Sequence, residues 1–558
     1  MKIINKFLLL IIIASLFLSI GYASINSISL DIKGKTTAKA STGLVITEVN
    51  KKSSNNSSSE LITAYNTNIQ VEAILNDIDS NVVYEIKMYN GTEFSYKYIG
   101  VEYIKEYYDN DAIQIEVIDT LEKIHSGETK TFRIKISYKS GTNISTVSNE
   151  LNGLINLKFI YIDKILNDTD PIMADGMIPV QISDNGSVKT ANLKDDWYNY
   201  SKQKWANTIL VKESSRSKYV GLEDVTVSQS DILAYYVWIP RFKYEIWYDG
   251  SSSNNPKTIN IVFHDKSEKS TGTTKGSYLT PPAFWWDRNS DSSRTNDEEI
   301  NGFWVGKFET SKGTSSDVGT SNPVILPNKS SWVSQTVSPQ FTTLLKFAGG
   351  TLSNGSVTFS GNSLYGLTSE VDSHMIKNTQ WAAMAYLSHS KYGINKEVRI
   401  NNYYSSGFLT GCGASADNAG KSTTCSIKYG NATSYPQSTT GNISGIFDTS
   451  GGAWERIMAN YNKKISSSEF NTLPPIKYYD LYTLSSLSAC TMQTCGGHAL
   501  HEVEGWYSDL NNLIASNYPW KVRSGGYEDG ATAGIFNFGR NAGQATNLSS
   551  MRSVLIVE

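Results

Sequence analysis

The chain has 558 residues, of which 39% are hydrophobic and 18% are charged, and its formal net charge is −3. This length exceeds one ordinary domain, and the apolar content is sufficient for packed cores, so wholesale disorder is excluded. A nearly neutral chain also lacks the basic surface that wraps nucleic acid, so we expect no nucleic-acid partner.

The first 23 residues have the pattern of an export segment. Lys2 and Lys6 begin the chain, residues 7–20 are almost entirely apolar, and small residues stand around Ala23. This order is typical of a secretory signal peptide, with the mature protein outside the cytoplasm. The apolar run of about 17 residues also reaches the lower limit for a membrane span, so an N-terminal anchor is the alternative. Only a retained segment would bring the protein to a membrane.

The composition changes near residues 165–170. All 13 prolines lie at or after Pro171, and all 12 tryptophans lie at or after Trp197. Different residue usage on the two sides indicates a domain border, with residues 166–171 as the start of a linker. We therefore predict a signal peptide or anchor (1–23), a β-sandwich stalk or assembly domain (24–165), a linker with short lead-in strands (166–235) and a C-terminal domain (236–558).

Residues 24–165 alternate between apolar and polar side chains. The alternation is strict in residues 131–138 and recurs in 84–88 and 113–117, with turn-forming pairs such as Asn90-Gly91 between such runs. Several short strands with one apolar face predict an all-β sandwich. The segment 21–40 (GYASINSISLDIKGKTTAKA) resembles exported biofilm-fibre and camelysin-type proteins of low-GC bacteria. That resemblance implies a secreted or cell-surface protein that can self-assemble through this domain.

Six segments follow one another in the C-terminal domain. They are 237–240 (VWIP), 302–311 (GFWVGKFETS), 378–393 (NTQWAAMAYLSHSKYG), 445–461 (GIFDTSGGAWERIMANY), 523–530 (RSGGYEDG) and 550–558 (SMRSVLIVE). The spacing of apolar residues in 378–393 predicts an amphipathic helix. The succession resembles the formylglycine-generating-enzyme family, also called sulfatase-modifying factors. The resemblance implies an α+β, C-type-lectin-like C-terminal fold.

The same resemblance implies a calcium site in the glycine-rich turn 448–455. Carried over residue by residue, Asp448 and Glu455 would bind calcium through carboxylates, and Gly451 and Ala453 through backbone carbonyls. Hard oxygen ligands on a glycine-containing loop suit this ion. The alternative is a purely structural turn with Trp454 in the core.

The catalytic members of the family carry two cysteines on the strand after the RGG motif. The corresponding positions here fall near Ile535 and Arg540, and no cysteine occurs from residue 496 to 558. Copper–thiolate oxidation requires thiolates, so we expect this member to lack that chemistry.

The four cysteines of the chain are an even number in an exported protein, which predicts two disulfides. Local pairing of Cys412 with Cys425 and of Cys490 with Cys495 is the simplest of three connectivities. A four-thiolate metal site is the alternative, although the chain contains no CxxC pair.

The closing hairpin combines aromatic, arginine and small polar side chains among glycines, a composition that suits ligand contact. In lectin-like proteins diversified by retroelements, this region is the variable binding face. The candidate ligand-binding residues are Tyr527, Glu528, Asn537, Arg540, Asn541 and Asn547. Phe536 and Phe538 could instead fill the core beneath them.

The sequence thus predicts an exported cell-surface protein, adhesin-like or receptor-like, that binds an extracellular protein or glycan. Two alternatives stay open. One is an extracellular oxidoreductase or modifying enzyme of the formylglycine-generating family, and the other is a structural biofilm-matrix subunit.

Overall fold

The computed structural model describes residues 43–557, with gaps at 66, 93, 106–111, 120, 122, 126, 147–149, 165–168, 193–196, 249–254, 405–407 and 414–420. The segment 1–23, predicted as a signal peptide or anchor, lies outside the described residues. The chain divides into two compact units, residues 1–165 and 166–558. Within the described part, no helix is both long and apolar enough to cross a membrane.

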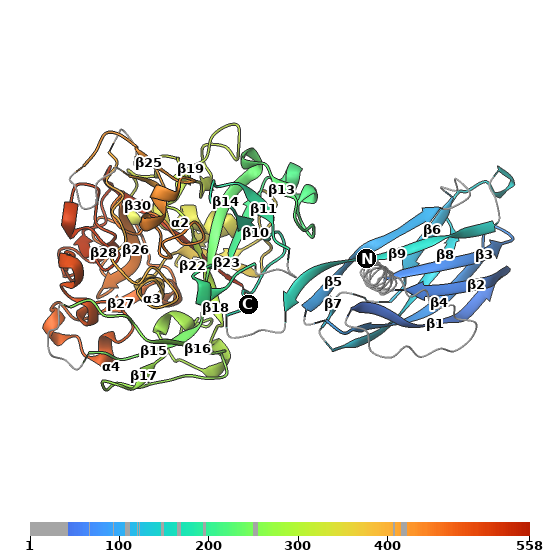
Figure 1. The fold of residues 1–558 in the computed structure, drawn as a ribbon, viewed down its shortest axis with the longest axis horizontal. Coiled ribbons are helices and arrows are strands. Elements are labelled where there is room, and N and C mark those ends of the chain that lie inside the picture. Colours follow the sequence, from blue (N-terminus) through green and yellow to red (C-terminus); the bar gives the residue numbers. More distant parts are fainter. Residues whose placement is uncertain are drawn as a thin grey trace, which may run out of the picture. The chain divides into compact units, whose positions relative to one another are not determined.

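The N-terminal unit contains two antiparallel sheets (Figure 1). One has the strand order β1-β4-β8-β6 and the other the order β2-β3-β9-β5-β7. The strands are β1 (Leu44–Asn55), β2 (Ser57–Tyr65), β3 (Asn68–Leu75), β4 (Asn81–Asn90), β5 (Phe94–Lys105), β6 (Ile113–Val117), β7 (Lys123–Ile124), β8 (Thr129–Tyr138) and β9 (Glu150–Lys164).

One hydrophobic core joins these two sheets. In β8, Phe132, Ile134 and Ile136 are buried while the residues between them are more exposed, as expected when side chains alternate across a strand. They pack in one cluster with residues of the other sheet, such as Val71 and Ile155. The alternation read from the sequence therefore places one face of each sheet in a shared interior.

The C-terminal unit is built around an eight-stranded sheet of order β13-β11-β10-β12-β14-β18-β31-β23. Its strands are β10 (Ile178–Ile182), β11 (Val188–Thr190), β12 (Asn207–Val211), β13 (Thr226–Val227), β14 (Ile232–Pro240), β18 (Gly302–Gly306), β23 (Val371–Met375) and β31 (Ser553–Val557). Residues 166–235 were predicted as a separate lead-in. They instead supply β10 to β13 and the start of β14, so position 236 is not a boundary.

A second sheet carries the candidate site. Its order is β27-β26-β28-β29, and β30 pairs with β26. These strands are β26 (Trp454–Tyr461), β27 (Asp480–Tyr482), β28 (Trp520–Arg523), β29 (Phe538–Asn541) and β30 (Ser549–Met551). Smaller sheets join β15 (Phe242–Glu245) to β16 (Ile261–Phe263) and β17 (Tyr278–Leu279), β19 (Ser311–Lys312) to β20 (Pro323–Val324), β21 (Gly350–Ser353) to β22 (Ser356–Phe359), and β24 (Cys412–Gly413) to β25 (Ile427–Lys428).

Among the described residues, the α-helices beside these sheets are α2 (Val337–Leu345), α3 (Asn378–Ser388) and α4 (Met492–Cys495). The helix expected in 378–393 is confirmed over Asn378–Ser388, but its expected amphipathic character is wrong. All eleven residues of α3 are buried, because the helix contacts β14 of one large sheet and β26 of the other. Its polar side chains have internal partners, for example Asn378, which donates a hydrogen bond to the hydroxyl of Tyr482.

Strands with a few short helices confirm the β-rich α+β class predicted for the chain. Both predicted disulfides are also present, joining Cys412 to Cys425 and Cys490 to Cys495.

Candidate functional site

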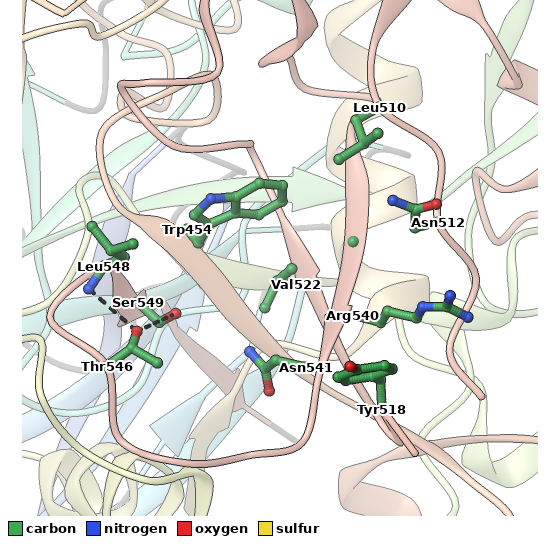
Figure 2. A pocket seen from close by; sticks show the side chains of 11 residues that line it. Trp454, Leu510, Asn512, Tyr518, Val522, Arg540, Asn541, Thr546, Leu548 and Ser549 are labelled. Atoms are coloured by element: carbon green, nitrogen blue, oxygen red, sulfur yellow. Dashed lines mark hydrogen bonds between the residues drawn. The ribbon is translucent and has the colours of Figure 1, made fainter. Parts of the chain in front are cut away.

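A pocket of about 340 Å³ opens on the second sheet of the C-terminal unit (Figure 2). Its walls come from β26, β28 and β29, from the turn before β30, and from the loop that precedes β28. The lining residues are Trp454, Leu510, Asn512, Tyr518, Val522, Gly539, Arg540, Asn541, Thr546, Leu548 and Ser549. Volume and lining fall in the range of small-ligand sites, which are mostly apolar with a few polar groups.

Strand register assembles the floor of this pocket. Alternation along β26 turns Trp454 toward the pocket and Glu455 toward the interior, and Val522 of β28 lies opposite Gly539 of β29. Gly539 is needed because a Cβ there would stand 2.9 Å from Cγ2 of Val522 and 3.0 Å from the indole of Trp454. The glycine therefore lets the indole lie close against the sheet.

Trp454 lines one side of the pocket, and Arg540 lines the other side together with Tyr518. In Figure 2, Val522 lies between Trp454 on one side and Arg540 with Tyr518 on the other. Tyr518 is 49% exposed, and the Arg540 guanidinium lies 5.5 Å from the centre of its ring. Arg540 Nη1 donates a hydrogen bond to the Leu513 carbonyl at 2.9 Å, which fixes the guanidinium at the rim.

Of the six predicted ligand-binding residues, Arg540 and Asn541 line the pocket. Glu528 and Asn547 are exposed but do not line it. Tyr527 and Asn537 are buried and do not line the pocket, so their role in ligand contact stays a prediction. The aromatic ring of Tyr527 stacks on Tyr404, with ring centroids 4.6 Å apart.

Asn537 has an internal partner, since its side-chain amide donates to the Thr532 carbonyl. Phe536 and Phe538 are fully buried, so the reading of these two side chains as core residues is confirmed.

Most of the pocket was not visible in the sequence. Trp454 was read as a core residue if the turn is structural, yet it is only half-buried. The loop before β28 has no recognisable motif, yet it supplies Leu510, Asn512 and Tyr518 to the pocket. Backbone hydrogen bonds of Leu510 and Asn512 with Phe538 hold this loop against β29. The only feature of the sequence that could have pointed to this loop as part of a pocket is its mixture of aromatic and amide side chains.

Glu455 and one oxygen of Asp448 have protein partners, whereas the buried Asp448 Oδ2 has none among the described residues. Glu455 is bound by Arg552, whose Nε donates to Oε2 at 2.8 Å, and both side chains are fully buried. Asp448 Oδ1 accepts hydrogen bonds from the Asn401 amide and the Gly411 backbone, both at 2.7 Å. The guanidinium supplies the positive charge that calcium would supply.

The other two predicted ligands are backbone carbonyls, and that of Ala453 accepts a hydrogen bond from Ser524 Oγ. Gly451 belongs to the same turn, and its N–H donates to the Ser524 carbonyl. Among the described residues, no group of three or more His, Cys, Asp or Glu side chains is placed to hold a metal ion. Calcium binding at this turn would require Arg552 to move away from Glu455.

A third carboxyl group, that of Glu309, lies beside this ion pair. Burial, together with the charges of Glu455 and Asp448, raises the pKa of Glu309 well above its usual range. Burial also raises the pKa of Asp448, while Arg552 opposes that rise. The positive charge of one buried arginine, Arg552, thus acts on three carboxyl groups, and the crowding of these groups favours the protonated form of Glu309.

The two positions near which the resemblance places catalytic cysteines are a buried isoleucine, Ile535, and the pocket residue Arg540. All four cysteines of the chain lie in the two disulfides. No thiolate is therefore available beside the pocket while these bonds are intact.

Neither the family models nor the curated proteins gave a significant match to this chain.

Proposed function

We propose that the protein is an exported cell-surface binding protein whose C-terminal unit holds an extracellular ligand in the pocket between Trp454 and Arg540. We also propose that this unit has the C-type-lectin-like fold of the formylglycine-generating-enzyme family, in a form without catalytic cysteines. The N-terminal β-sandwich would then carry the binding unit away from the cell.

The pocket is the observation that supports binding. A half-buried tryptophan, an exposed tyrosine and an arginine converge there from separate segments, and residues of these types dominate the energetics of binding sites. Exposed aromatic side chains are unfavourable in water, so their clustering around a pocket is more typical of ligand contact than of packing. The oxidoreductase alternative lacks comparable support, because each cysteine is engaged in a disulfide.

Labelled full-length protein on a glycan array and on immobilised extracellular-matrix proteins tests this function. We expect the binding signals to be lost in Trp454→Ala and Tyr518→Ala, because both remove pocket walls. Leu222→Ala is the matched control, since Leu222 is 49% exposed and does not line the pocket. No binding by the natural chain, or signals that survive both pocket variants, would overturn the proposal.

A further inference from the structure

The described residues that line the pocket include a positively charged side chain and no negatively charged one. Arg540 is the one charged residue among them, and no Asp or Glu belongs to this lining. Within the described part of the chain, Arg540 forms no ion pair and makes one hydrogen bond, to the Leu513 carbonyl. The remaining N–H groups of this exposed guanidinium are available to an anion, and a carboxylate can accept two of them in parallel.

A second arginine, Arg456, is bound to the turn that leads into one wall of the pocket. Arg456 stands two residues after Trp454 on β26 and is fully buried. Its guanidinium donates to the carbonyls of Gln335 and Gln544, and its Nε has no partner among the described residues. Gln544 belongs to the turn that continues into the pocket wall at Thr546. The hydrogen-bond partners of Arg456, which include Gln340 Oε1, are all neutral, so this buried guanidinium has no carboxylate partner among the described residues.

The uncharged lining suits a sugar ring. Trp454 and Tyr518 offer aromatic faces, on which the C–H groups of a pyranose ring can pack. The side chain of Asn512 and the Nδ2 group of Asn541 have no protein partner among the described residues, although Asn541 Oδ1 accepts from Gly543. Amide groups beside aromatic rings provide the directional hydrogen bonds that ring hydroxyls need.

An extended peptide fits less well. Peptides that bind sheets usually pair with a free strand edge. The outer edge of β29 is occupied at Phe538, which accepts a hydrogen bond from the Asn512 backbone and donates one to the Leu510 carbonyl. The pocket also has a volume of about 340 Å³, near the lower end of small-ligand sites.

From this charge and this lining we infer that the pocket binds a carboxylated sugar ring, with the carboxylate on Arg540 and the ring against Trp454 and Tyr518. The inference rests on the proposed binding function and specifies its ligand class.

The test is calorimetric titration of the full chain with galacturonate, glucuronate and N-acetylneuraminate oligosaccharides. Each ligand is paired with its carboxamide, which differs only in charge. We expect at least one acid to bind at least about tenfold more tightly than its amide, the usual effect of one charge-assisted hydrogen bond. Arg540→Gln should remove this preference and leave the amide affinity within twofold.

Lys189→Gln is the matched control, because it removes the same charge from β11 of the other sheet and should preserve the preference. Tyr518→Ala should weaken the acid and the amide together, and its exposed position leaves the fold intact. An acidic peptide, tetraglutamate, serves as the competing ligand class.

Equal binding of acids and amides would refute the role of charge and leave the binding function standing. Binding of tetraglutamate alone, lost in Arg540→Gln, would refute the sugar and again leave the function standing. If none of these ligands binds at millimolar concentration, the inference is wrong, and the array comparison of Trp454→Ala with Leu222→Ala decides the binding function separately.

Discussion

Glu502 should make the stability of the C-terminal unit depend on pH. Its carboxylate accepts hydrogen bonds from the hydroxyls of Tyr244 and Tyr386 and from the Gly497 backbone at 3.0 Å. These donors favour the ionised form, but burial outweighs them and raises the pKa of Glu502 from 4.5 to about 7. Between these two values the folded protein binds a proton that the unfolded chain releases.

The sign of the effect follows from this proton. A carboxyl group with a raised pKa in the folded state contributes stability that is fully present below pH 4.5 and is lost as the pH rises through about 7. The difference between the two pKa values corresponds to about 3 kcal/mol of unfolding free energy. Glu502→Gln cannot ionise, so its unfolding free energy should fall less than that of the natural chain between pH 4.5 and 7.5, by up to about 3 kcal/mol.

Urea unfolding followed by tryptophan fluorescence measures the unfolding free energy of the C-terminal unit. All 12 tryptophans lie at or after Trp197, so the signal reports the C-terminal unit alone. Glu504→Gln is the control, because the side chain of Glu504 is 40% exposed and lies two residues further along. Identical pH dependence in Glu502→Gln and the natural chain would refute the assignment of the raised pKa to this carboxyl group.

Three further predictions concern the same unit. Replacing Cys412 and Cys425 by serine should lower the unfolding free energy by about 3 kcal/mol, the chain-entropy value for a loop of this length, and an unchanged urea midpoint would contradict it. Arg552→Met should cost about 3–5 kcal/mol because it leaves a buried carboxylate unpaired, and adding Glu455→Gln should recover part of the loss in a double-mutant cycle. Because Arg552 already neutralises the turn, excess calcium and chelator should give the same melting temperature; a rise of several degrees in calcium that Asp448→Asn removes would restore the calcium site.

Local patterns in the sequence determined part of the structure. The alternation in residues 131–138 fixed which face of β8 is buried, since a strand repeats every two residues. Cysteines 13 and 5 residues apart can approach each other through a short loop, so their pairing was also predictable. The change in proline and tryptophan usage coincides with the division between the two units.

Contacts between distant segments decided the rest. The helical spacing of 378–388 was readable, but its complete burial depends on two sheets that cover it from different sides. The sequence offers Glu455 as a calcium ligand, and only the tertiary structure shows that Arg552, 97 residues away, donates a hydrogen bond to it. Trp454, Tyr518 and Arg540 line one pocket because the pairing of the strands brings their segments together. The identity of a hydrophobic or charged residue in the sequence does not show which distant residue will lie opposite it.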